Sequence, residues 1–198
     1  MTKLLPGFAD PVRDSQATFR ALLDAMAHPG KIQNVRPASA ALDHGAGLAI
    51  SPLHPATAAL LLTLADAETP LWLDPAVIAV TGWVAFHCGA PLVSAAEAQF
   101  AVALADPPFA ALHAGTDEEP ENSATLILQV AALGAGDCYT LTGPGLASAT
   151  TFAAAGLPPE FQAFWSANHR LFPRGIDLIL TEGDRFAALP RTVRMERA

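Results

Sequence analysis

The stretch Thr125-Leu126-Ile127-Leu128-Gln129-Val130 (TLILQV) decides the fold class of this chain. Leucine and β-branched residues follow one another almost without a break, which is typical of a strand covered on both faces. A strand with one face in water would instead alternate apolar and polar side chains. The stretch therefore predicts a central sheet with other elements packed against both of its faces.

Outward from this strand, predicted helices and strands interleave along the chain. Helices are expected over residues 11–27, 52–66, 107–114 and 158–171. Further strands are expected over residues 31–35, 70–73, 91–93, 99–104, 138–142, 176–180 and 186–190. Residues 74–88 carry signals of both kinds, and the spacing of Val77, Val84 and His87 favours a helix. This alternation indicates an α/β fold.

Two connections between predicted strands are too short for the crossover that parallel neighbours need. The first contains Gly134-Ala135-Gly136-Asp137, which predicts a turn, and the second contains Gly183-Asp184, which predicts a hairpin. The sheet is therefore expected to be mixed. No repeat or linker interrupts the pattern, so one α/β domain is expected over residues 1–198.

The composition is apolar, with 52% hydrophobic and 15% charged residues among 198. No apolar run reaches the roughly 18 to 20 residues that a membrane-spanning helix needs. The first residues, Met1 to Gly7, lack the apolar stretch of a signal peptide. We therefore expect a cytoplasmic protein that is not inserted in a membrane and buries much of its apolar surface in a core or against a partner.

The charge distribution restricts where an anion can bind. The net charge of −8 is the wrong sign for a general nucleic-acid binder. No Lys or Arg lies between Arg36 and Arg170, so any cationic side chain must come from the two flanks. These flanks hold Lys3, Arg13, Arg20, Lys31 and Arg36, and then Arg170, Arg174, Arg185, Arg191, Arg194 and Arg197. Any one of them can equally serve only to solvate the surface.

The two cysteines, Cys88 and Cys138, lie 50 positions apart without a CxxC spacing. They cannot supply the three or four thiolates of a structural zinc site or an iron–sulfur cluster. Two reduced thiols are expected in a cytosolic protein, with a disulfide as the alternative. No metal site is predicted.

Two motifs have both a functional and a structural interpretation. Thr142-Gly143-Pro144-Gly145-Leu146 follows a predicted strand, where Gly143 and Gly145 could let backbone amides approach a phosphate or could simply form a turn. His87 and Cys88 are adjacent, but neighbouring residues do not normally face each other, so a partly buried histidine is the simpler interpretation. No GxSxG or HExxH motif is present. The residues indicate no self-sufficient set of catalytic groups.

Several blocks together resemble the PhnH family of carbon–phosphorus lyase subunits. The resemblance rests on residues 14–30 (DSQATFRALLDAMAHPG), 61–73 (LLTLADAETPLWL), 86–87 with 90–93, 125–130, 141–143 and 172–192 (FPRGIDLILTEGDRFAALPRT). These blocks occur in order over nearly the whole chain. No single one of them carries the resemblance alone.

The resemblance implies a three-layer αβα sandwich around a mixed sheet, like the fold of pyridoxal-phosphate-dependent transferases without the cofactor. The residues agree, because the two lysines, Lys3 and Lys31, do not lie where a Schiff-base lysine is expected after several strands. We therefore expect the chain to bind neither pyridoxal phosphate nor an iron–sulfur cluster.

The resemblance also implies an assembly. Members of this family act with PhnG, PhnI and PhnL in the step where a phosphonate displaces adenine from ATP to give ribose 1-phosphonate 5-triphosphate. They form homodimers and join a larger complex that includes PhnJ, in which ATP is a substrate. The chain is accordingly expected to be a transferase subunit with no activity alone.

A second hypothesis is that the chain itself holds substrate. Arg20 and Arg191 would grip a phosphate or phosphonate, with His87 and the backbone of Gly143 and Gly145 beside them. This hypothesis requires both flanks of the chain to meet in space, and Arg20 could instead pair with Asp24 on its own helix. A third hypothesis, a stand-alone enzyme of another class, would require turnover by the isolated chain. Catalytic residues are not identified.

Overall fold

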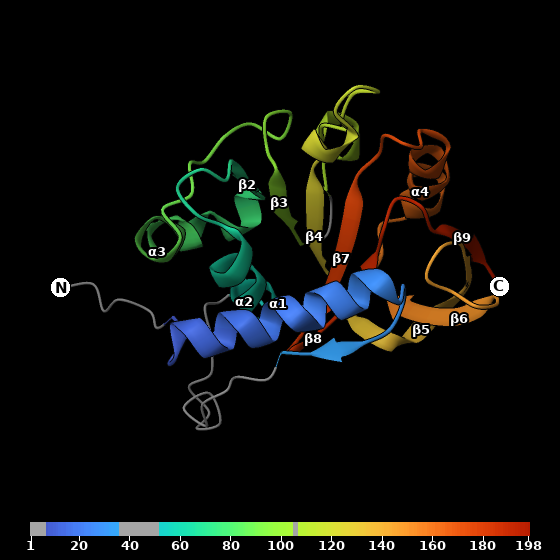
Figure 1. Cartoon of the computed structure of the whole chain (residues 1–198), viewed down its shortest axis with the longest axis horizontal. Helices are drawn as coiled ribbons and strands as arrows, with labels where there is room; N and C mark the ends of the chain where they lie inside the picture. The colour runs from blue at the N-terminus through green and yellow to red at the C-terminus, as the bar shows by residue number, and fades with distance from the viewer. Residues whose placement is uncertain (1–6, 36–51, 105–106) are drawn as a thin grey trace.

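A computed structural model describes residues 7–35, 52–104 and 107–198 (Figure 1). The α-helices are α1 (Pro11–Ala27), α2 (Pro55–Leu64), α3 (Thr81–His87) and α4 (Phe161–Arg170). Short 3-10 helices are η2 (Pro75–Val80), η3 (Phe109–Ala111) and η4 (Pro120–Asn122). Within the described ranges, no helix is long and apolar enough to cross a membrane.

A six-stranded mixed sheet forms the centre of the molecule. Its strands, in spatial order, are β1 (Gln33–Asn34), β8 (Arg185–Leu189), β7 (Asp177–Glu182), β4 (Thr125–Gln129), β3 (Phe100–Ala103) and β2 (Leu71–Leu73). The strands β2, β3, β4 and β7 are parallel, whereas β8 is antiparallel to both β7 and β1. The expected mixed sheet and the β7–β8 hairpin are both confirmed.

The strand β4 is buried on both sides, as its sequence predicts. Ile127 packs into the core on the side of α1, α2 and α3. Leu126 and Leu128 point the other way, into a second core that contains residues of α4. The same division holds along β7, where Ile179 faces the first core and Leu178 the second. Alternation of side chains along each strand thus separates two cores with the sheet between them.

The second face of the sheet differs from a purely helical layer. It is covered by α4 and by a three-stranded antiparallel sheet of β6 (Thr150–Ala155), β5 (Ala132–Thr142) and β9 (Arg194–Arg197). This face therefore departs in part from the expected αβα sandwich. The physical reason lies in β5 and β6, which bury alternate side chains such as Tyr139 and Phe152 and so present one apolar side to the core.

Several local predictions were wrong. Residues 134–137 form no separate turn but a register shift inside β5, where Gly134 and Gly136 adopt positive φ of 81° and 101°. Residues 91–93 contribute one isolated bridge, Leu71 to Leu92, and residues 107–114 contain only η3. Strands β6 and β9 were not predicted. Residues 74–88 do form helix, as η2 followed by α3.

The first helix begins and ends as its sequence predicts. Asp10 caps it, its carboxylate accepting a hydrogen bond of 3.1 Å from the Arg13 amide, and Pro11 occupies the first turn. Leu22 and Ala25 face the core, which leaves Phe19 and Leu23 exposed on the outer side. Figure 1 shows the helix crossing the front of the molecule below α2. The helix therefore forms part of the outer layer that covers the first core.

Candidate functional site

Arg191 is held by an ion pair at the edge where β4 and β7 begin. Its guanidinium donates to both carboxylate oxygens of Asp177, at 3.2 and 2.5 Å, and to the carbonyl oxygen of Pro120 at 2.7 Å. Its side chain is 14% exposed and that of Asp177 is 16% exposed. The Arg191 amide also donates to Asp177, at 2.8 Å. Arg191 therefore ties β7 to the chain after β8 and to η4.

The glycines of residues 142–146 lie in a closely packed turn. Gly143 and Gly145 both have positive φ, of 138° and 85°. A Cβ on Gly143 would come within 2.9 Å of the Thr192 carbonyl oxygen, and one on Gly145 would collide with the carbonyl oxygen of Ala27. The space beside both glycines is thus filled by protein backbone that presents hydrogen-bond acceptors. This environment fits a structural turn better than a phosphate cradle.

His87 and Arg20 lie on α3 and α1, the helices that cover the first core. His87 ends α3, with its ring 5.2 Å from that of Trp83 and 4.9 Å from that of Phe86. Arg20 is exposed on α1 and has no ion pair among the described residues. The alternative pairing with Asp24 is not formed.

Asp24 instead binds residues beyond the end of α1. Its carboxylate accepts hydrogen bonds from Lys31, at 2.7 Å, and from Gln33. The hydrogen bond from Lys31 holds the pKa of Asp24 below its ordinary value. The contact joins the helix to β1, so both Asp24 and Lys31 have structural roles.

The structure does not bring the five predicted site residues together. Strand order explains the separation, because α3 connects β2 to β3 at one end of the sheet, whereas Arg191 follows β8 near the other. Neighbouring strands lie about 4.8 Å apart, so three strand spacings between β2 and β7 amount to about 14 Å. The Asp177 carboxylate and the Pro120 carbonyl also accept from the Nε, Nη1 and Nη2 groups of Arg191. His87 and Arg191 therefore lie at different parts of the sheet, and a shared anion site of Arg20, His87 and Arg191 stays a prediction.

Cys88 and His87 form no nucleophile–base pair in this arrangement. The Cys88 thiol points inward, 3.7 Å from the carbonyl oxygen of Leu61, and burial raises its pKa to about 11. Cys138 is exposed on β5, and neither cysteine is in a disulfide. In the parts of the chain that the structure describes, no three His, Cys, Asp or Glu side chains gather into a possible metal site.

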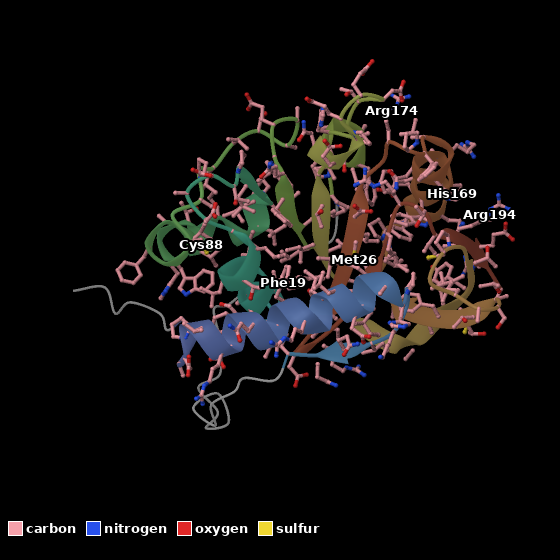
Figure 2. All side chains as sticks on the ribbon, in the orientation of Figure 1. Phe19, Met26, Cys88, His169, Arg174 and Arg194 are labelled. Atoms are coloured by element: carbon pink, nitrogen blue, oxygen red, sulfur yellow. The ribbon has the colours of Figure 1, made fainter. Side chains whose placement is uncertain are left out.

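A cationic cavity lies elsewhere, between α4 and β9. Its volume is about 250 Å³, and it is lined by Trp165, Ser166, His169, Arg170, Arg194, Met195 and Glu196. Figure 2 shows His169 and Arg194 close together at this end of the molecule. We call it the α4–β9 cavity. Arg170 and Arg194 are among the cations of the two flanks, but no motif in the sequence distinguishes them or His169 from the other candidates.

The outer surface of α1, η2 and α3 carries exposed apolar side chains. Val12, Phe19 and Leu23 on α1 are 66%, 46% and 53% exposed, and Ile78 and Phe86 on η2 and α3 are 60% and 63% exposed. Positions 12, 19 and 23 recur at helical spacing, so they form one stripe along the helix. We call these five residues the apolar face. Several exposed large apolar side chains on these elements favour contact with another protein.

Comparison with known proteins identifies the family. Residues 6–196 match the family described as bacterial phosphonate metabolism protein (PhnH). The chain is 40% identical over 196 residues to the α-D-ribose 1-methylphosphonate 5-triphosphate synthase subunit PhnH of Rhizobium meliloti (strain 1021), covering 96% of this chain and 94% of the relative. It is 30% identical over 184 residues to HtxG of Stutzerimonas stutzeri, named for a C–P lyase subunit, covering 91% and 85%. The chain therefore belongs to the PhnH family of bacterial phosphonate metabolism proteins.

Proposed function

We propose that this chain is the PhnH subunit of an α-D-ribose 1-methylphosphonate 5-triphosphate synthase in C–P lyase phosphonate metabolism. The observation that carries the proposal is the 40% identity to a synthase subunit over 96% of this chain and 94% of that relative. A match over nearly the full length of both chains supports equivalence of the whole subunit. A shared fold alone would be a weaker argument, because one fold hosts many functions.

The reaction proposed for the assembly is a ribosyl transfer. A phosphonate oxygen forms a bond to the anomeric carbon of the ATP ribose, and the bond from that carbon to adenine breaks. Adenine leaves with a proton, and ribose 1-phosphonate 5-triphosphate remains. In the described residues, Arg191, His87 and Cys88 occupy separate and structurally explained positions. This separation supports a chain that contributes to the assembly without performing the reaction alone.

We propose PhnG, PhnI and PhnL as partners in this step and PhnJ as a member of the larger complex, with this chain itself forming a homodimer. The apolar face of Val12, Phe19, Leu23, Ile78 and Phe86 supports a subunit role, since burying such side chains against another protein removes apolar surface from water. Each fully buried side chain of this size stabilises an interface by roughly 1.5–3 kcal/mol before the costs of association. We propose that another synthase subunit covers this face.

The prediction that no pyridoxal phosphate binds here has structural support. Lys31 is the lysine that the structure describes, and its ammonium group donates to Asp24 at 2.7 Å. A lysine that forms a Schiff base must instead be free to lose its proton beside the cofactor. A likeness to pyridoxal-phosphate-dependent transferases and a cytoplasmic location remain parts of the proposal.

The test is reconstitution with and without this chain. Tagged PhnI is co-expressed with PhnG, PhnL and this chain, purified, and assayed for adenine release from ATP and methylphosphonate. We expect adenine release from the complete set and its loss when this chain is omitted. Full activity without this chain, or adenine release by this chain alone, would contradict the proposed subunit role.

A second measurement concerns assembly. Size-exclusion chromatography of the tagged set should show this chain eluting with its partners. Elution only as a free monomer or dimer would overturn the proposed partnership. In that case the binding properties of the isolated protein would become the main question.

A further inference from the structure

The α4–β9 cavity joins two segments that are distant in sequence. His169 and Arg170 lie in the last turn of α4, and Arg194 begins β9 after the connection that follows β8. Two hydrogen bonds join α4 to the segment of β9. Trp165 donates through its indole nitrogen to the Val193 carbonyl oxygen at 3.0 Å, and Gln162 donates to the Met195 carbonyl oxygen at 2.6 Å. The cavity therefore has a fixed floor.

The arginines of this cavity differ from most other cations of the molecule. The structure describes nine of the eleven Lys and Arg side chains, since Lys3 and Arg36 fall outside the described residues. Six of these nine form an ion pair with a carboxylate, namely Arg13, Lys31, Arg174, Arg185, Arg191 and Arg197. The remaining three have no such partner within the described residues, and two of them, Arg170 and Arg194, line the cavity.

His169 adds an imidazole to the lining of the cavity. Its Nδ1 lies 3.3 Å from the carbonyl oxygen of Arg191. A carbonyl only accepts hydrogen bonds, so Nδ1 carries the proton and Nε2 is left available. The ring is partly buried, and its contact with the Arg191 carbonyl oxygen orients it.

Glu196 and Ser166 complete the polar lining. Arg194 and Glu196 are separated by two positions on β9, so both side chains project from the outer side while Met195 faces the core. The carboxylate lowers the positive potential of the cavity. Two guanidinium groups still leave a net positive charge beside the Ser166 hydroxyl.

We propose that the α4–β9 cavity binds a phosphate or phosphonate group of a small molecule. Guanidinium groups bind such tetrahedral oxyanions through paired, charge-assisted hydrogen bonds. The positive charge of Arg170 also interacts favourably with the negative end of the α4 dipole, so this arginine is stable at its position without a ligand. Their lack of carboxylate partners beside an open cavity is the observation that a solely structural role leaves unexplained. The site does not depend on the proposed synthase activity.

The test is direct binding by the purified full chain. Inorganic phosphate, tripolyphosphate and methylphosphonate are titrated separately by isothermal calorimetry, first at low and then at high ionic strength. We expect saturable binding of at least one oxyanion, weakened by salt because exposed charges are screened. Preference among the three probes distinguishes a phosphate, a polyphosphate and a phosphonate ligand.

Three variants localise the site. Replacing both cavity arginines (R170A/R194A) should raise the Kd by about tenfold or more, since charge-assisted hydrogen bonds are lost. Arg20→Ala removes the third unpaired guanidinium on the opposite face and should leave the Kd unchanged. Glu196→Gln should tighten binding. The thermal unfolding midpoint should be unchanged in all three, because each altered side chain is exposed.

Two outcomes overturn the proposal. Absence of saturable binding by the unaltered chain is one, and equal weakening by R20A and R170A/R194A is the other, because it would indicate attraction to surface charge in general. If no oxyanion binds but R170A/R194A abolishes co-elution with the synthase subunits, the arginines instead contact an acidic surface of another protein. That result also rejects the cavity as a small-molecule site.

Discussion

The two outer surfaces of the molecule differ in the way they expose their side chains. Over α1, η2 and α3, large apolar groups such as Phe19 and Phe86 are exposed, and Arg20 is a single cation without an ion pair among the described residues. On the opposite side of the sheet, Arg170 and Arg194 lack carboxylate partners within the described residues and line a cavity. The first surface suits contact with another protein, and the second suits a small anion.

This difference arises from one sheet with two separate cores. The side chains of β4 alternate between the cores, so both surfaces depend on the same strand. The first core is closed by helices, and the second by α4 together with the three-stranded sheet. A change in one layer is therefore expected to disturb its own surface before it disturbs the other.

Trp165→Ala should have the largest effect. The side chain is fully buried under α4 and donates to Val193, so its removal leaves a cavity and an unsatisfied carbonyl. The free energy of unfolding should fall by about 3–5 kcal/mol, measured by urea unfolding. Phe164→Ala removes a half-buried ring from the same helix and should cost less. An equal or larger loss for Phe164→Ala would show that α4 is not anchored through Trp165.

Arg191→Met should have the next largest effect. It leaves the Asp177 carboxylate mostly buried without its cationic partner, which should lower the free energy of unfolding by about 1–3 kcal/mol. Asp177→Asn together with Arg191→Met should cost less than the sum of the two single changes, because the interaction is lost only once. If Arg191 instead binds substrate, Arg191→Met would reduce adenine release by the assembly while leaving the unfolding free energy unchanged.

The buried thiol of Cys88 should make the stability of the first core depend on pH. Burial raises the pKa of Cys88 to about 11, so the folded protein keeps this proton at a pH where the unfolded chain loses it. The stabilising contribution is complete below the ordinary thiol pKa of about 8.5 and is lost as pH rises through the folded value, at no more than about 1.4 kcal/mol per pH unit. Cys88→Ala should remove this part of the pH dependence in urea unfolding.

Alkylation provides an independent check of the same contrast. At pH 8 in the native protein, a thiol reagent should modify the exposed Cys138 and leave the buried Cys88 unmodified. Both should react in denaturant. Rapid modification of Cys88 in the native protein would mean that α3 opens readily, against the buried position seen here.

Phe19→Glu should have the smallest effect on stability. Its side chain is 46% exposed on α1, so the free energy of unfolding should change by no more than about 0.5 kcal/mol. Co-elution with the other synthase subunits should nevertheless be lost, because a carboxylate would be buried in the proposed interface. Ala110→Glu adds the same charge on η3, on the opposite surface, and should leave co-elution intact. Normal co-elution of both variants would show that the apolar face does not contribute to assembly.

Local patterns predicted the elements whose causes are local. Asp10 and Pro11 mark the start of α1, and the unbroken run around Ile127 requires two covered faces. Strands β6 and β9 were missed because their few inward residues, such as Met195, carry a short and weak alternation. The likeness to the PhnH family was also available from the sequence, because its matching blocks are spread over the whole chain.

Sequence patterns were enough to predict the mixed α/β architecture, the first helix, the family, and the restriction of cations to the two flanks. Which of those cations form ion pairs depends on the folded chain, which brings Arg191 to Asp177 and places Arg170 and Arg194 beside one cavity. Secondary structure follows from periodicity over a few residues. The distance between two guanidinium groups depends instead on strand order and on the packing of α4 against β9, to which residues throughout the chain contribute.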